Sequence, residues 1–293
     1  MTNRRNLLTN IVPFLFLAAC LLLPTSCKHK TPADNRPVIT VSIEPLRQMV
    51  EQLVEGRYRV VTIMPQGASP ESYEPTPRQM VELAESRMLF CVGTLGFEKT
   101  RLQQMTEIAP EVPVVRLSDG IEMLEETAGC DTEHETDPHV WMCPDNMCQL
   151  VENACEALCR IDSANASHYR LLAEKQMAQY RTTDLQIQSA LKKLSHRTFL
   201  IYHPALGYFA HRYGLKQVAV EQEGKEPSAA YLQQLENLCR AEKVKVVFIS
   251  KEHTGRAARR LAESLGARVV EINPLSDDVN SQFFNIVEAL NHE

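Results

Sequence analysis

Four polar side chains that can bind a metal each follow an apolar run of the sequence: Glu71, His139, His203 and Asn273. Any one of them alone is more commonly a solvated or structural group than a ligand. The prediction therefore depends on their convergence from separate segments. Two imidazoles and a carboxylate that meet in this way suit a transition metal such as zinc, manganese or iron.

The apolar runs indicate a parallel β-sheet in each half of the chain. They are rich in β-branched residues, and they cover 38–43, 58–64, 88–92 and 112–117, then 198–202, 216–220, 244–249 and 267–272. Such continuous runs are typical of strands buried on both faces. We therefore expect an α/β fold of two lobes, each with a four-stranded parallel sheet. Because ligands bind beyond the carboxyl ends of such strands, the metal site is expected in the cleft between the lobes.

The segment 165–194 separates the two sets of runs and predicts one long helix. It contains no Gly or Pro, and its apolar residues recur at spacings of three to four. At 1.5 Å per residue, the helix would be about 45 Å long and stiffer than a flexible hinge. The predicted organisation is an N-terminal lobe at 38–162, a linking helix at 163–195 and a C-terminal lobe at 196–293.

The N-terminus predicts export. Two arginines precede an apolar stretch at 11–23, and small residues lead to Cys27, as in a signal peptide. We expect a lipoprotein signal peptide at 1–26, lipid modification of Cys27 and a polar tether at 27–37. Cys20 fits the lipobox pattern letter for letter, but cleavage there would leave an apolar start. An uncleaved N-terminal anchor is the other alternative.

Charge and cysteine content exclude some classes of function. The 293 residues carry 31 Lys and Arg against 37 Asp and Glu, so the net charge of −6 argues against a nucleic-acid partner. Of the 9 cysteines, Cys148, Cys155 and Cys159 share one face of a predicted helix. They could form a thiolate metal site, although a helical stripe of free cysteines is usually part of the core.

Six segments resemble the metal-binding solute-binding proteins of bacterial ABC importers for zinc and manganese. In order they are PQGASPESYEPTP (65–77), VGTLGFE (92–98), DPHVWMCP (137–144), YHPALGYFAHRYGL (202–215), EPS (226–228) and INPL (272–275). The resemblance covers the mature chain and implies two α/β lobes joined by a rigid helix. It also implies a periplasmic, membrane-anchored, monomeric receptor that delivers its metal to an ABC permease.

The resemblance implies a ligand set in which His139 and His203 are the second and third metal ligands. Glu71 stands where the family has its first histidine, and Asn273 where it usually has an aspartate. His203 favours zinc, since manganese-type members usually have Glu there, and manganese or iron are the alternatives. The implied site is His139, His203 and Glu71, with Asn273 or water as a weaker fourth partner.

Other assignments stay open at this point. Asp277 or Asp278 could supply the missing carboxylate. The acidic segment 118–136, which contains His134, could attract cations or form a weak secondary site, although such a segment is more commonly a solvated loop. A metal-dependent hydrolase could use the same His, His and Glu groups to activate water, but the sequence has no HExxH helix.

Overall fold

The N-terminal lobe is built on a parallel sheet in the order β2-β1-β3-β4. The computed structural model describes residues 34–125, 136–221, 227–252 and 254–292, so the predicted signal peptide, Cys27 and His134 lie outside the described residues. The strands are β1 (Val38–Val41), β2 (Arg59–Thr62), β3 (Ser86–Cys91) and β4 (Val114–Arg116). All neighbouring pairs are parallel, as the apolar runs predict.

The C-terminal lobe repeats the arrangement with a second parallel sheet in the order β6-β5-β7-β8. Its strands are β5 (Thr198–Ile201), β6 (Lys216–Ala219), β7 (Val246–Ser250) and β8 (Arg268–Ile272). The predicted α/β fold with two four-stranded sheets is therefore confirmed. The main difference is that several strands are shorter than the apolar runs, because the ends of the runs continue into buried loops.

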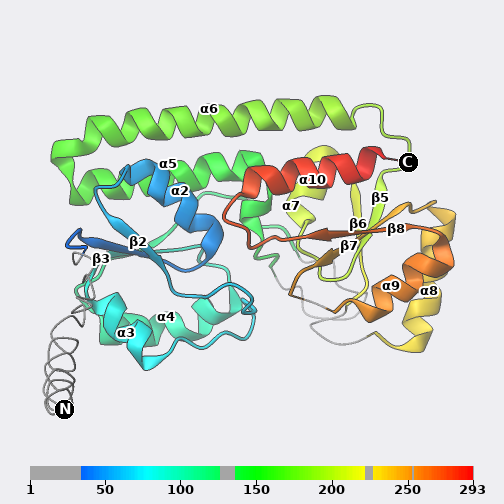
Figure 1. Cartoon of the computed structure of the whole chain (residues 1–293), viewed down its shortest axis with the longest axis horizontal. Helices are drawn as coiled ribbons and strands as arrows, with labels where there is room; N and C mark the ends of the chain where they lie inside the picture. The colour runs from blue at the N-terminus through cyan, green and yellow to red at the C-terminus, as the bar shows by residue number, and fades with distance from the viewer. Residues whose placement is uncertain (1–33, 126–135, 222–226, 253, 293) are drawn as a thin grey trace, which may run out of the picture. The chain divides into compact units, whose positions relative to one another are not determined.

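Helices connect the strands in both lobes (Figure 1). They are α2 (Glu44–Val54), α3 (Pro77–Ala84), α4 (Gly96–Ile108), α5 (Pro144–Ile161), α6 (Ala166–Leu191), α7 (Gly207–Tyr213), α8 (Ala229–Ala241), α9 (Arg256–Leu265) and α10 (Val279–Asn291), with short 3-10 turns η2 (Val140–Met142) and η3 (Ser163–Asn165). Capping residues in the sequence determine where two of these helices begin. Thr76 caps α3 in a capping box with Gln79, and Ser228 caps α8.

The long helix α6 lies alongside α5 and α10, as Figure 1 shows. It buries Tyr169, Tyr180, Ile187 and Leu191. These residues belong to a continuous apolar core that includes residues of both lobes. The predicted linking helix is confirmed, although it ends at Leu191, and the exact boundaries of the lobes stay a prediction.

A partly buried ion pair and a hydrogen bond also join α6 to the C-terminal lobe. The Asp184 carboxylate of α6 accepts hydrogen bonds from Arg212 at 2.8 Å and from the Tyr213 hydroxyl at 2.9 Å, both on α7. Burial and the adjacent Asp184 charge raise the pKa of Tyr213, so its hydroxyl remains a donor. Since α7 follows the segment that carries His203, this contact helps to fix one side of the predicted site.

The cysteine stripe of α5 is part of the core. Cys155 is buried, while Cys148 and Cys159 pack against the core from its edge. Burial raises the pKa of Cys148 to about 11 and that of Cys155 to about 12. Thiols of this kind are poor metal ligands because the thiolate is the form that binds. In the part of the chain that the structure describes, no helix has both the length and the apolar character needed to cross a membrane.

Candidate metal site

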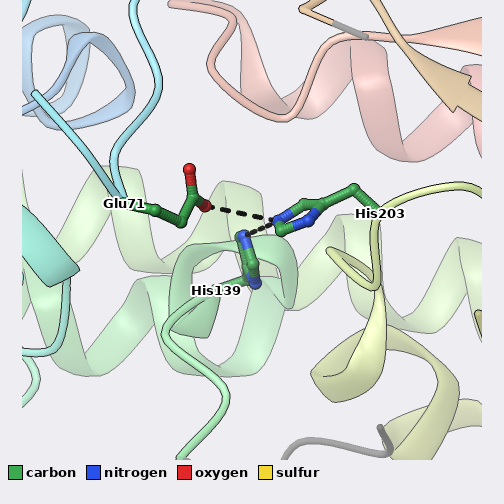
Figure 2. A group of neighbouring side chains, drawn as sticks. All are labelled: Glu71, His139 and His203. Atoms are coloured by element: carbon green, nitrogen blue, oxygen red, sulfur yellow. Dashed lines mark hydrogen bonds and ion pairs between the residues drawn. The ribbon is translucent and has the colours of Figure 1, made fainter. Parts of the chain in front are cut away.

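Three of the four side chains predicted from the sequence converge (Figure 2). One ligand atom from each of Glu71, His139 and His203 lies within 4.8 Å of the others. The Nε2 atom of His203 lies 3.3 Å from Nε2 of His139 and 3.4 Å from a carboxylate oxygen of Glu71. Glu71 comes from the loop between β2 and α3, His139 directly precedes η2, and His203 follows β5. The cluster thus draws on both lobes.

His139 is held in place by Asp137. The side chain of Asp137 is buried, and its Oδ1 accepts a hydrogen bond from the His139 backbone N–H at 2.9 Å. The same oxygen lies 2.9 Å from Nδ1 of the His139 ring. A carboxylate at Nδ1 favours the tautomer with a proton there and leaves the Nε2 lone pair for a metal. His139 itself is only 4% exposed, so its orientation is fixed before any ion arrives.

His203 has a similar partner in Glu221. Oε1 of Glu221 lies 3.3 Å from Nδ1 of His203, and Glu221 is buried just after β6. Sequence analysis missed both this carboxylate and the orienting role of Asp137. The signal for Glu221 was present, because it directly follows the apolar run 216–220, as the other candidates follow theirs.

Glu71 forms the outer side of the cluster, with a side chain that is 48% exposed. Its carboxylate accepts a hydrogen bond from the Ser69 hydroxyl. Partial burial raises the pKa of Glu71, but the nearby His203 and the Ser69 hydrogen bond lower it more, so the net pKa lies below its ordinary value. The backbone of Glu71 packs on Gly96 at the start of α4, where an added Cβ would lie 2.9 Å from the Glu71 carbonyl oxygen.

Asn273 is not brought into the cluster. Its side-chain oxygen accepts a hydrogen bond from the Leu275 backbone N–H at 3.1 Å, which forms a local turn. The two aspartates considered as substitutes are also engaged elsewhere. Asp278 caps α10, and Asp277 lies 3.7 Å from Arg47. The assignment of a fourth ligand to Asn273 therefore stays a prediction, and its hydrogen bond does not favour it.

The cluster lines a pocket whose cavity volume is about 20 Å³. This is room for one ion or one water molecule, not for an organic substrate. Trp141 closes one side, and its indole N–H donates to the Pro274 carbonyl at 2.8 Å, which ties the segment after His139 to the loop after β8. Among the described residues that line the pocket, two are acidic and none is Lys or Arg. The electrostatics therefore favour a cation.

Comparisons with known proteins found relatives that cover most of the chain. The family model described as zinc-uptake complex component A, periplasmic (ZnuA), matches residues 39–291. The high-affinity zinc uptake system protein ZnuA of Bacillus subtilis is 27% identical over 278 residues, which are 89% of this chain and 85% of that protein. The zinc-binding lipoprotein AdcA of Streptococcus pneumoniae is 24% identical over 285 residues, 90% of this chain but 55% of AdcA, so this chain spans about half of that relative.

Solved structures show the same fold. A crystal structure of ZnuA gives a TM-score of 0.82 at 26% identity, with 88% of this chain and 98% of that chain covered. A manganese-bound periplasmic metal binding protein from Candidatus Liberibacter asiaticus gives a TM-score of 0.77 at 21% identity, with 87% and 100% covered, which supports the fold alone. Because the family match extends from the first strand to the last helix, the chain belongs to the ZnuA family, whose members are solute-binding components of metal-uptake systems and not enzymes.

Proposed function

We propose that this protein captures a divalent transition metal, zinc in preference to others, outside the inner membrane and delivers it to an ABC permease. The observation that carries the proposal is the convergence of His139, His203 and Glu71 at one small pocket. Ligands at about 2.0–2.1 Å in a tetrahedron around zinc lie about 3.3–3.4 Å apart. The two separations that involve His203, 3.3 and 3.4 Å, match this spacing, and all three ligand atoms lie within 4.8 Å of one another.

The donor set supports zinc over its competitors. Two imidazole nitrogens suit zinc better than the harder manganese ion, which prefers oxygen ligands. Glu71 adds one carboxylate and makes the site harder than a set of three histidines, so manganese and ferrous iron remain competitors. The names of the relatives from B. subtilis and S. pneumoniae refer to zinc, while manganese-bound and cadmium-bound structures occur among the proteins of similar fold.

Metal titration of the purified mature protein tests the site. Calorimetry and chelator competition should give one zinc ion per chain, bound more tightly than manganese or iron. The double variant His139→Ala/His203→Ala should lose tight binding, because it removes both nitrogen donors. His211→Ala is the matched control, since His211 is exposed on α7 outside the pocket. Tight stoichiometric binding by the double variant would refute this site.

The proposal extends to location and partner. Cys27 carries the lipid, residues 27–37 tether the folded body as a monomer, and the protein is held at the periplasmic side of a membrane. Mass spectrometry of the membrane fraction should find an acylated N-terminal Cys27, and Cys27→Ser should release the protein. Zinc uptake by vesicles that contain the cognate permease should require the loaded protein, and uptake that is equally fast without it would refute delivery.

A further inference from the structure

The three converging side chains leave one position of a tetrahedral zinc site to be filled. The Nδ1 atoms of His139 and His203 already lie beside the buried carboxylates of Asp137 and Glu221. The side-chain oxygen of Asn273 accepts a hydrogen bond within a local turn. A protein that must hold its metal until delivery benefits from a closed coordination sphere, which is the usual state of non-catalytic zinc sites. A fourth donor should therefore be sought among the remaining side chains that line the pocket.

Two oxygen-bearing side chains after β7 line the same pocket. Ser250 ends the strand and is only 2% exposed, and Glu252 lies two residues later, partly buried. The Ser250 hydroxyl has no hydrogen-bond partner among the described residues. A buried hydroxyl without a partner is costly, so a group that enters this pocket and accepts its hydrogen bond would be stabilised there.

The same Ser-x-Glu spacing occurs on the other side of the pocket. In Ser69-Pro70-Glu71 of the N-terminal lobe, the serine hydroxyl already donates to the glutamate that faces the histidines. Ser250-Lys251-Glu252 repeats the spacing in the C-terminal lobe. The first pair therefore shows that a serine hydroxyl can hydrogen-bond a glutamate two residues later whose carboxylate lies beside the histidines.

We propose that Glu252, which lines the pocket but lies outside the cluster of Glu71, His139 and His203 in this structure, turns its carboxylate inward as the fourth metal ligand, and that the Ser250 hydroxyl then orients that carboxylate. This inference rests on the proposed metal-binding function. Each lobe then supplies one imidazole and one carboxylate: His139 and Glu71 from the first, His203 and Glu252 from the second. Two carboxylates also balance the charge of a divalent ion, which lowers the cost of holding the ion in a partly buried pocket.

Zinc affinity of single variants tests the proposal. Glu252→Gln should bind zinc roughly 10- to 100-fold more weakly, which is the scale seen when a supporting group of a metal site is lost. Ser250→Ala should show a smaller loss in the same direction. Glu263→Gln is the matched control because Glu263 is an exposed carboxylate of α9 outside the pocket, and it should bind like the wild type. Thermal melts of the metal-free variants show whether each folds.

A crystal structure of the zinc-loaded protein provides the second readout. The proposal expects a Glu252 oxygen at about 2.0–2.2 Å from the zinc ion. Wild-type affinity in Glu252→Gln, or a water molecule or the Asn273 oxygen in the fourth position, would overturn it. The double histidine variant keeps this result separate from the proposed function. If that variant loses tight binding while Glu252→Gln does not, the metal site stands and only the fourth ligand is wrong.

Discussion

Gly207 offers a way to disturb the metal site without changing any residue that faces the pocket. It is the first residue of α7, and a Cβ added there would collide with Oδ2 of Asp137 and lie 3.3 Å from its Cγ. Contacts this close force the Asp137 carboxylate to move. Its other oxygen accepts from the backbone N–H of His139 and lies beside the ring nitrogen, both at 2.9 Å. We therefore expect Gly207→Ala to release the His139 ring from its orientation.

The expected loss follows from these hydrogen bonds. One hydrogen bond to a charged group contributes about 1.5–3 kcal/mol, so losing the bond at Nδ1 should weaken zinc binding roughly 10- to 100-fold. The same substitution should stabilise helix α7 itself, because alanine is favoured over glycine in helices by up to about 1 kcal/mol. A loss of affinity without a loss of helical structure would therefore point to the contact with Asp137.

A double-mutant cycle with Asp137→Ala measures that contact. Chelator competition should show that Gly207→Ala and Asp137→Ala each weaken zinc binding, and that the double variant is no weaker than Asp137→Ala alone. The second change should add nothing because the carboxylate through which it acts is already gone. Additive losses, or wild-type affinity in Gly207→Ala, would refute the reasoning. Circular dichroism of the metal-free proteins controls for misfolding.

Three further predictions follow from the site and the fold. Glu71→His should raise the preference for zinc over manganese by about tenfold or more, because it replaces the hard carboxylate donor by a third imidazole. Parallel titrations with both metals measure the ratio of the two affinities, and an unchanged ratio would contradict the prediction. Zinc affinity should fall on acidification, since protons compete with the metal for both imidazole nitrogens. The lowered pKa of Glu71 keeps that carboxylate charged to lower pH than an ordinary glutamate, so the loss should come mainly from the two imidazoles. Competition titrations that give a flat profile would exclude histidine ligands. Asp184→Asn should lower the free energy of unfolding by about 2 kcal/mol, because Arg212 and Tyr213 lose a charged partner. Urea denaturation measures this change. An unchanged midpoint would show that the contacts of Asp184 with these two residues do not stabilise the fold.

Most of the fold could be predicted from hydrophobic patterning. The runs around Val60 and Val247 are mostly apolar, as expected for strands of a parallel sheet whose two faces are covered by helices. The helix α6 could be recognised because 26 residues run without Gly or Pro. Patterning could not determine the ends of strands, since buried apolar residues such as Val220 continue past the last residue of β6, Ala219.

The site was only partly predictable. His139 and His203 follow from the rule that ligand groups lie beyond strand ends, and the structure brings both together with Glu71. The same rule could not exclude Asn273, because only the geometry shows that its oxygen accepts a backbone hydrogen bond from Leu275. Glu221 obeys the rule and was nevertheless missed, since its orienting role depends on packing between separate loops.

The three clustered side chains differ in their access to water, and this difference bears on how an ion leaves. His139 is 4% exposed, the His203 side chain 13% and the Glu71 side chain 48%. Water or a competing ligand can therefore reach the Glu71 bond first and the His139 bond last. We expect zinc to dissociate in that order, with loss of the carboxylate as the first step. In the proposed delivery to a permease, contact with the loop around Glu71 would speed release by displacing one ligand, without separating two lobes that a continuous apolar cluster joins.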